Sequence, residues 1–207
     1  MPTIPDLESL SQRYKLVATE VSVAQRTFEI WKPDNIDDLI NEAEFDADER
    51  LPYWAEVWPS GRVLAEQLAG RPADGRRLLE LGCGLGLVSL LARWIGFDVL
   101  ATDYYEPALE FTAFNAAHNA IPPVATRLLD WRKLPDDLGS FDLIVAGDVL
   151  YERPNSALVA NVLDRCLAPE GLALVTDPSR RVAGQFPDLC AERRLKVERI
   201  ARLEVVP

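Results

Sequence analysis

The feature that most constrains the fold lies at residues 78–86, where an apolar run with one acidic residue is followed by glycines at alternate positions. The acidic residue is Glu80, and the glycines are Gly82, Gly84 and Gly86. This pattern predicts a buried strand that breaks into a tight loop, after which a helix begins. Open α/β sheets bind nucleotides at loops of this kind.

The spacing of the glycines bears on which nucleotide the loop suits. A dinucleotide fingerprint has glycines at its first, third and sixth positions, but the sixth position counted from Gly82 is Leu87. The pattern is Glu-x-Gly-x-Gly-x-Gly instead. This form suits S-adenosyl-L-methionine better than NAD, so we expect S-adenosyl-L-methionine as the cofactor.

Length and charge set limits on domain number and partners. A chain of 207 residues is most economically one domain, and it is long enough to bury a full α/β core. Its formal charge of -11 argues against a nucleic-acid partner, because such proteins usually present a positive surface to phosphates. A cationic partner is easier to accommodate, and we expect a monomer.

Apolar runs and cysteine usage indicate where the protein works. No run approaches the roughly 20 apolar residues that a membrane span needs, and the N-terminus carries acids and prolines instead of a signal-peptide core. We therefore expect a cytoplasmic protein with no membrane partner. The cysteines Cys83, Cys166 and Cys190 lack metal-like spacing and are expected to be reduced. The single histidine, His118, is interpreted as structural, and no metal site is expected.

Residues 1–50 are predicted to form an extension that precedes the main domain. Apolar residues alternate in part between 15 and 31, which predicts a pair of strands. A short helix is expected near 34–41. Acidic residues crowd 41–50, and this composition predicts a solvated loop.

The main domain is expected at residues 51–207, with a first helix that Ser60 caps and Gly70 ends. Apolar strands then alternate with helical segments, which implies an α/β fold with a doubly wound, mostly parallel Rossmann-like sheet. For the tail at 195–207 we expect an antiparallel edge strand or a cut-off pair, because it has no Gly, Asn or Asp to turn a hairpin. The predicted strands lie at 78–81, 98–102, 125–129, 141–146 and 171–176, and the predicted helices at 87–94, 107–119, 155–166 and near 184–194.

Asp103 ends the second predicted strand of the sheet, about 21 residues beyond Gly82. A carboxylate at this point can accept from both hydroxyls of a ribose, as it does in dinucleotide folds. Alternatively, Asp103 could be the N-cap of the helix at Pro107. Position and context favour the ribose.

Asp130 and Trp131 end the third predicted strand on the same side of the sheet. Asp130 could accept from an adenine amino group while Trp131 contacts the adenine face. The tryptophan could also simply cover the rim of the sheet.

Residues 147–151 follow the fourth predicted strand, which lies beside the first in a doubly wound order. This placement puts Asp148 and Tyr151 over the position at which a bound cofactor presents its reactive methyl group. The alternative is an aspartate that caps a loop and a tyrosine in the core. Base-reading amino methyltransferases carry prolines here, where this chain has Val149 and Leu150.

Two further segments bear on the acceptor side. Residues 52–61 hold a cluster of aromatic residues that could be core, a lid over the methionine end of the cofactor, or the wall of a substrate channel. Residues 177–180 close the fifth predicted strand and could bring Arg180 to the substrate mouth, or form a turn with a solvated charge.

With these residues in view, the chain resembles the seven-β-strand S-adenosylmethionine-dependent methyltransferases. It is most similar to the methyltransferase family 16 group of protein-lysine methyltransferases, which includes the enzyme that modifies the electron-transfer flavoprotein β subunit. The glycine loop alone identifies only the superfamily, whereas the Trp-Pro-Ser-Gly segment at 58–61 and the Asp-x-x-Tyr motif at 148–151 are more specific. The matching segments lie at 53–61, 79–86, 101–103, 130–131, 148–151 and 177–178.

The resemblance implies a seven-stranded sheet and particular residues at the site. It implies that Asp148 and Tyr151 lie at the methyl-acceptor site. The residues implied for the cofactor site, with the neighbours that we expect there too, are Trp58, Glu80, Gly82, Cys83, Gly84, Gly86, Asp103, Tyr104, Asp130, Trp131 and Ala146.

The resemblance also implies a lysine-bearing protein as the methyl acceptor. A small heteroaromatic amine is an alternative acceptor, since some relatives have been labelled nicotinamide N-methyltransferases. A cofactor-binding but inactive interaction module is a second alternative. The segment at 195–207 is short beside the family pattern, in which an antiparallel hairpin closes the sheet.

Overall fold

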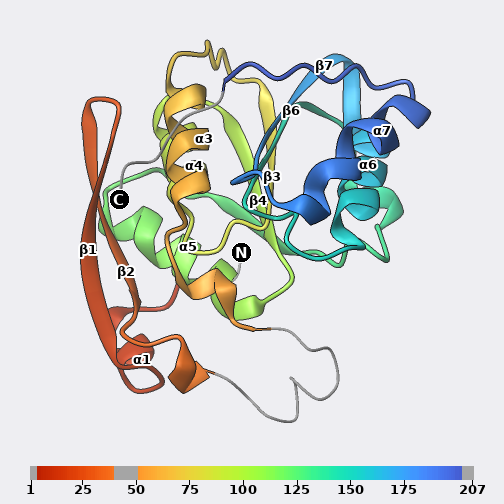
Figure 1. The fold of residues 1–207 in the computed structure, drawn as a ribbon. Coiled ribbons are helices and arrows are strands. Elements are labelled where there is room, and N and C mark those ends of the chain that lie inside the picture. The colour runs from red at the N-terminus through yellow and green to blue at the C-terminus, as the bar shows by residue number, and fades with distance from the viewer. Residues whose placement is uncertain (1–3, 40–50, 202–207) are drawn as a thin grey trace.

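Five parallel strands form the central sheet of the computed structural model, which describes residues 4–39 and 51–201 (Figure 1). The strands lie in the order β5-β4-β3-β6-β7. The central strands β3 and β6 are almost wholly buried, which fits a parallel sheet covered on both faces. The bounds are Arg77–Leu81 for β3, Asp98–Asp103 for β4, Ala125–Leu128 for β5, Phe141–Gly147 for β6 and Leu167–Thr176 for β7.

The strand order reverses between β3 and β6. From β3 the chain winds outward through β4 to β5, and it then returns to place β6 on the other side of β3. Leu81 at the end of β3 is consequently in register with Thr102 of β4 and with Ala146 of β6. A crevice opens outside the carboxyl ends of the strands at such a reversal, and α/β folds bind their ligands there.

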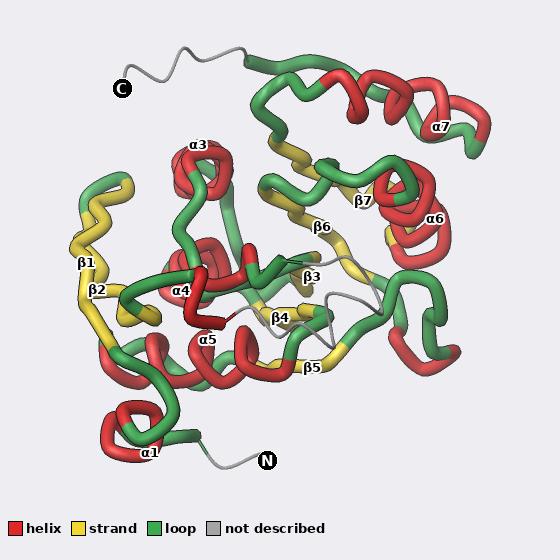
Figure 2. The backbone as a smooth tube through the Cα atoms, turned by 60° about the horizontal axis from the view of Figure 1, so that its bottom comes forward, coloured by secondary structure: helices red, strands yellow, loops and turns green. Residues whose placement is uncertain are grey.

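Two hydrophobic clusters cover the two faces of the sheet, because side chains alternate along each strand. Leu78 and Val145 belong to the cluster on the side of α3, α4 and α5, whereas Leu79 and Ile144 belong to the cluster on the side of α6 and α7 (Figure 2). Among the described residues, none of the helices has the length and apolar character that crossing a membrane requires. The bounds are Pro59–Ala69 for α3, Leu87–Trp94 for α4, Glu106–His118 for α5, Asn155–Cys166 for α6 and Phe186–Glu192 for α7.

An antiparallel hairpin forms a second, two-stranded sheet beside the main one (Figure 1). Its strands are β1 (Leu16–Val23) and β2 (Arg26–Pro33), and the short helix α1 (Leu7–Ser11) precedes them. The hairpin packs against α3 and α5. Phe28 and Ile30 of β2 are fully buried and join the same hydrophobic cluster as these two helices.

Two asparagines, Asn115 in α5 and Asn119 at its C-cap, bind the outer edge of β2. The side chain of Asn119 accepts from the Glu29 N–H at 2.9 Å and donates to the Glu29 carbonyl at 2.8 Å. The side chain of Asn115 accepts from the Trp31 N–H at 2.9 Å and donates to the Trp31 carbonyl at 3.1 Å. It also donates to the carbonyl of Leu85 at 3.0 Å. The amide groups thus take the place of a neighbouring strand, which satisfies main-chain groups that would otherwise be buried without partners.

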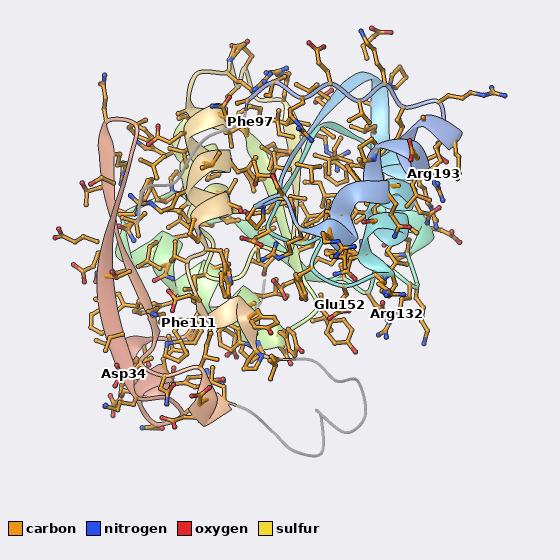
Figure 3. The ribbon with its side chains drawn as sticks, in the orientation of Figure 1. Asp34, Phe97, Phe111, Arg132, Glu152 and Arg193 are labelled. Carbon is orange, nitrogen blue, oxygen red and sulfur yellow. The ribbon has the colours of Figure 1, made fainter. Side chains whose placement is uncertain are left out.

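Aromatic contacts and an ion pair connect the hairpin side to the segment before α3. Phe111 of α5, labelled in Figure 3, contacts Tyr14 and Trp54, whose ring centroids are 5.5 and 5.6 Å from its own. Lys32 of β2 forms an ion pair with Glu56. These contacts fix the aromatic segment at 52–61 against the core.

Most of the predicted elements are confirmed. The helices at 87–94 and 155–166 have the predicted bounds, Gly70 is the C-cap of α3, and the strand pair forms within 15–33. The prediction that Ser60 caps α3 is wrong. The helix begins at Pro59 with Trp58 as its N-cap, and Ser60 is buried in the first turn. Proline suits this first position because it has no N–H to satisfy.

Other parts of the prediction differ from the structure or lie outside it. Within the described residues the main sheet has five strands instead of seven, and the segment at 195–201 adds none to it. A 3₁₀ turn at Asp37–Leu39 takes the place of the short helix near 34–41. The tail forms no strand at 195–201, whereas 202–207 and the whole loop predicted at 41–50 lie outside the described residues.

Replacing Asn115 with Ala tests the contribution of these amide contacts. Asn115 is fully buried, so its loss leaves main-chain groups of Trp31 and Leu85 without partners. We expect the free energy of unfolding to fall by about 2–4 kcal/mol, measured by urea denaturation. The half-exposed Asn119 provides the matched control, because water can replace its contacts, and Asn119→Ala should cost about 1 kcal/mol. Equal losses in the two variants would contradict the special role of Asn115.

Candidate functional site

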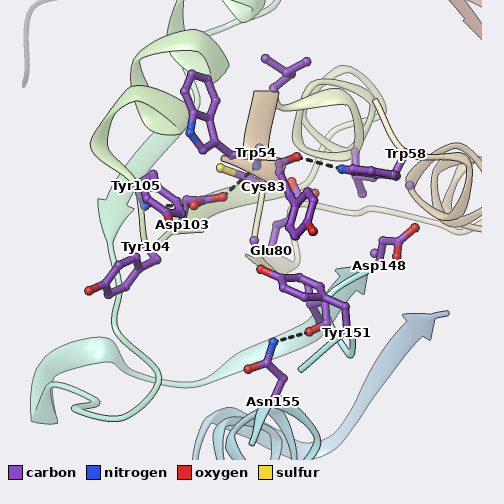
Figure 4. Close-up of a pocket in the computed structure, with 18 of the residues that line it drawn as sticks. Trp54, Trp58, Glu80, Cys83, Asp103, Tyr104, Tyr105, Asp148, Tyr151 and Asn155 are labelled. Carbon is purple, nitrogen blue, oxygen red and sulfur yellow. Dashed lines mark hydrogen bonds between the residues drawn. The ribbon is translucent and has the colours of Figure 1, made fainter. Parts of the chain in front are cut away.

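A pocket opens at the carboxyl ends of the strands, where the strand order reverses (Figure 4). The glycine loop after β3 forms its floor, and the segments that follow β4, β5 and β6 form one wall each. The aromatic segment before α3 and the start of α6 complete the lining. Segments distant in the sequence therefore meet at one site.

The glycine loop needs glycine because its backbone is left-handed and closely packed. Gly82 has φ +69°, and a Cβ placed there would lie 2.9 Å from Cγ1 of Val149. Gly84 has φ +51°, and its Cβ would lie 3.0 Å from the carbonyl oxygen of Trp54. Any other residue at these positions would strain the backbone and press on the pocket wall.

Glu80 is a buried carboxyl group at the base of the pocket. It is 3% exposed and forms a hydrogen bond with the hydroxyl of Ser89. Burial raises the pKa of Glu80 to about 8, because removal from water disfavours the charged form, and the nearby charge of Asp103 adds to the effect. Near neutral pH this group therefore carries a proton for most of the time.

Asp103 connects the end of β4 to the glycine loop. Its Oδ2 accepts from the N–H of Gly84 at 2.9 Å, and its Oδ1 accepts from the N–H of Tyr105 at 3.0 Å. Burial raises the pKa of Asp103, and these main-chain donors oppose the rise. Tyr105 is the N-cap residue of α5, and no side chain caps this helix, so the alternative reading of Asp103 as an N-cap does not hold.

Asp130 and Trp131 line the pocket beyond the end of β5. Arg132 folds back on Asp130, with Nε at 2.8 Å from Oδ1 and Nη2 at 3.0 Å from Oδ2. The guanidinium also lies over the ring of Tyr104, 5.3 Å from its centroid. Trp131 is half-buried, and its Nε1–H is buried with no hydrogen-bond partner within the described part of the chain.

Asp148 stands at the opposite wall, directly after β6. Its φ of +62° is left-handed, and its N–H donates to the carbonyl of Thr176 at 2.9 Å, which joins the ends of β6 and β7. The carboxylate forms an ion pair with Arg180, and its side chain is 5% exposed. Arg180 thus lies beside Asp148, paired with it and with Asp177, and it is not part of the pocket lining.

Aromatic rings form the wall near Asp148 (Figure 4). Tyr53 makes edge-to-face contacts with Trp58 and Tyr151, at centroid distances of 5.8 and 5.4 Å. The Nε1–H of Trp58 donates to the carbonyl of Tyr53 at 2.8 Å, which orients its indole. Asn155 of α6 donates to the carbonyl of Val149 at 2.8 Å and so fixes the segment that carries Asp148 and Tyr151.

The structure brings most of the predicted site residues into this one pocket. Two of them lie beside it instead of lining it. Gly86 is the N-cap of α4, where a Cβ would lie 2.9 Å from the side chain of Thr112, and Ala146 is fully buried in the cluster beneath α6. The predicted residues in the lining are Trp58, Glu80, Gly82, Cys83, Gly84, Asp103, Tyr104, Asp130, Trp131, Asp148 and Tyr151.

Sequence reasoning missed Arg132 and Asn155. Arg132 follows the Asp-Trp pair directly, and an arginine so close to a predicted site carboxylate could have signalled an ion pair. Asn155 gave no signal beyond its place at the start of a helix. His118 pairs with Glu29 at 3.0 Å beside the hairpin, away from the pocket, as expected of a structural histidine.

Comparison with known proteins identifies relatives of this chain. The sequence profile of the family described as lysine methyltransferase matches residues 44–186. The electron transfer flavoprotein beta subunit lysine methyltransferase of Danio rerio is 32% identical over 148 residues, which cover 70% of this chain and 55% of that protein. The protein N-lysine methyltransferase METTL21A of Danio rerio is 33% identical over 136 residues, which cover 61% of this chain and 62% of that protein. The chain thus spans little more than half the length of these curated relatives.

A solved structure shares the fold over nearly the whole chain. The 16S rRNA N2 G1207 methyltransferase of T. thermophilus, in complex with AdoMet and guanosine, aligns with a TM-score of 0.64 and 19% identity. The alignment covers 93% of this chain and 47% of that one. At this identity the likeness concerns the fold alone.

Replacing Glu80 with Gln tests the burial of its carboxyl group. With a raised pKa, the folded state holds a proton between about pH 4.5 and about pH 8 that the unfolded state releases, so the wild-type protein loses stability as the pH rises through this window. Glu80→Gln has no such proton to lose. Its free energy of unfolding relative to the wild type should therefore increase by about 1 kcal/mol or more between about pH 5 and about pH 9.

Urea unfolding of both proteins at the two pH values measures this difference. Asp103 is present in both proteins, so the comparison cancels its contribution to first order. A difference that does not change with pH would contradict the protonated, buried state of Glu80.

Proposed function

The chain belongs to the lysine methyltransferase family, and from this membership and the geometry of the pocket we propose that it transfers a methyl group from S-adenosylmethionine to a lysine side chain of a protein. The proposal rests on the observation that one pocket holds a buried carboxyl group at each of its two ends. Asp103, with its main-chain donors, lies at one end, and the buried carboxylate of Asp148 beside Tyr151 lies at the other.

The ribose end of the cofactor fits Asp103. The carboxylate has about four acceptor positions, and the main-chain N–H groups of Gly84, Tyr104 and Tyr105 donate to it. Acceptor capacity therefore remains for a ribose hydroxyl. Because Gly82 and Gly84 have no side chains, a ligand can come close to the main chain of the loop.

The adenine end fits the wall formed after β5. The buried Nε1–H of Trp131, which has no partner among the described residues, is a donor for an acceptor atom of the ligand, because a buried donor normally finds a partner. Asp130 is held in place by the main-chain N–H and the guanidinium of Arg132, so an adenine amino group there would share or replace one of these contacts. The ring of Tyr104, with Arg132 on it, extends this wall.

Glu80 fits the cationic methionine end of the cofactor. A positive charge near this carboxyl group favours its ionised form and lowers its raised pKa, so binding of the cation is coupled to release of the proton. When bound, the cofactor supplies a methyl group on a positively charged sulfur. Trp58 and Tyr53 lie on the acceptor side of this end and help to exclude water from it.

Asp148 and Tyr151 suit a lysine amine as the acceptor. The neutral amine must attack the methyl carbon, so that the C–N bond forms while the electron pair of the C–S bond stays on the sulfur. Deprotonating a free lysine at pH 7 costs about 4.6 kcal/mol, since its pKa is near 10.4. Asp148 accepts an N–H of the amine and orients its lone pair, Tyr151 forms the wall beside it, and the proton leaves to water.

A protein acceptor agrees with the charge of the chain. The formal charge of -11 attracts a lysine-rich surface and disfavours nucleic acid. A small heteroaromatic amine is the second candidate, because the rings of Tyr53, Trp58 and Tyr151 could hold a planar acceptor.

We further propose a monomer that works in the cytoplasm without a membrane partner.

Replacing Asp148 with Asn tests the acceptor role. We expect methyl transfer from labelled S-adenosylmethionine to a lysate protein to fall about 100-fold, because the amine loses its orientation, while cofactor affinity stays within about twofold. Asp188→Asn, on the exposed first turn of α7, is the matched control and should retain wild-type transfer. Label in the low-molecular-weight fraction alone would favour the small-amine acceptor, and cofactor binding without any transfer would favour an inactive module. A protein label that persists unchanged in Asp148→Asn would refute the role of this residue.

Replacing Asp103 with Asn tests the ribose contact. S-adenosylhomocysteine at about 100 times its Kd should add about 2.7 kcal/mol to the stability of the wild type in an unfolding assay. We expect Asp103→Asn to lose most of this gain, since the amide offers fewer acceptor positions. Asp98→Asn, at the exposed opposite end of β4, should keep it. A full gain in Asp103→Asn would argue against this placement of the cofactor.

A further inference from the structure

Arg180 lies in the segment after β7, beside Asp148 and outside the pocket lining. Its Nη1 forms an ion pair with Oδ1 of Asp148 and lies 3.1 Å from Oδ2 of Asp177. The side chains of Asp148 and Asp177 are only 5% and 12% exposed, and that of Arg180 is 31% exposed. Water therefore screens these charges only in part.

The backbone on both sides holds the two partners together. Asp148 and Ser179 both have left-handed φ angles, of +62° and +67°, which non-glycine residues rarely adopt. The N–H of Arg180 donates to Oδ1 of Asp177 at 2.7 Å. Such conformations are kept only where the surroundings enforce them, and they gather at functional sites. The turns after β6 and β7 thus hold Asp148 and Arg180 in place for the ion pair.

Acidic groups dominate the surroundings of Asp148. Glu56 is already paired with Lys32, and on the α3 side the neighbours of Gly147 are Gly61 and Leu64, which do not titrate. Within the described residues, the cation paired with Asp148 is Arg180. The other ionisable groups around the acceptor end are Tyr53, Glu56, Glu80, Tyr151 and Glu152 in the pocket lining, and Asp177 after β7.

A bare carboxylate would hinder the proposed reaction. An opposite charge within about 4–6 Å favours the charged form of an amine and shifts its pKa by about 1–3 units. Each unit reduces the neutral, nucleophilic fraction tenfold. An uncompensated Asp148 would therefore bind the lysine firmly in its unreactive ammonium form.

On the basis of the proposed lysine methylation, we propose that Arg180 is a positioning residue of the acceptor site, which compensates the charge of Asp148 so that the acceptor amine gives up its proton more readily than beside a bare carboxylate. Arg180 uses one oxygen of Asp148, and the carboxylate keeps further acceptor positions for the amine. Asp148 can therefore orient the amine without strongly stabilising its charged, unreactive form.

The guanidinium can serve this purpose at every pH at which the enzyme works. Burial opposes its charged form, but the hydrogen bonds and charges of Asp148 and Asp177 outweigh this effect and raise the pKa of Arg180 above its ordinary value. Asp177 also holds Arg180 at a fixed distance from the pocket, whose lining does not include it. The cation therefore acts through Asp148 and does not contact the substrate.

The pH profile of kcat tests this role, because kcat reports ionisations in the enzyme–substrate complex. The acceptor is the lysate protein that the wild type labels most strongly, purified and used at saturation with S-adenosylmethionine. In Arg180→Gln we expect the rise of kcat to move about one unit to higher pH, which means about tenfold slower transfer near pH 8 and convergence with the wild type at higher pH. The KM for the protein should stay the same or fall, since the ammonium form binds better.

Further variants separate compensation from a structural effect. Arg181→Gln, the exposed neighbour, makes the same change of net charge and should keep the wild-type profile. Arg180→Lys restores a cation and should return the profile toward the wild type. Asp148→Asn leaves Arg180 paired with Asp177 alone and should move the profile to lower pH, whereas the double variant Asp148→Asn, Arg180→Gln should return it close to the wild-type position.

The outcomes distinguish this inference from the proposed function. If the wild type labels no lysate protein, the proposed function fails, and the role of Arg180 fails with it. If the wild type labels a protein but Arg180→Gln lowers kcat equally at every pH, or raises KM without moving the profile, only the compensating role is refuted. S-adenosylhomocysteine affinity serves as the folding control and should be unchanged in Arg180→Gln.

Discussion

The pocket depends on the hydrogen bond from the N–H of Gly84 to the carboxylate of Asp103, which joins the loop after β3 to the end of β4. The same carboxylate accepts the N–H of Tyr105 at the start of α5. Because Asp103 is buried, these donors are what makes a polar group acceptable there. The glycine loop, the end of β4 and the start of α5 thus form one unit, around which the other walls of the pocket are arranged.

Local patterns explain why much of this site could be predicted from the sequence. The glycine spacing and the apolar run around Glu80 are properties of neighbouring residues, and so are the acidic residues that end β4 and follow β6. A doubly wound order then brings these strand ends to one edge. The wrong cap at Ser60 shows the limit of local rules, because Pro59 supplied a different start that needed no side-chain cap.

Contacts between distant residues explain what the sequence could not predict. Asn115 and Asn119 have ordinary positions in a helix, and only the docking of β2 gives them partners 84 and 90 residues away. Through its bond to the carbonyl of Leu85, Asn115 also connects the hairpin to the glycine loop. The N-terminal extension therefore supports the pocket from behind, although its sequence carries no sign of this. The pairing of Arg180 with Asp148 likewise depends on two left-handed turns that no composition rule indicates.

The carboxyl groups of the pocket fall into two classes, and the division follows from their partners. Asp130 and Asp148, at the two walls, are each paired with an arginine, so their charges are compensated before any ligand arrives. Glu80 at the base of the pocket and Asp103 at its proposed ribose end have hydroxyl and main-chain donors instead, and burial raises the pKa of both. A nearby cation stabilises the charged form of a buried carboxyl group most when that group has no cationic partner of its own. It adds little where an arginine is already paired with the carboxylate. The charge of the proposed sulfonium cofactor is therefore directed to Glu80, and the carboxylates that are paired with arginines are left to provide orientation.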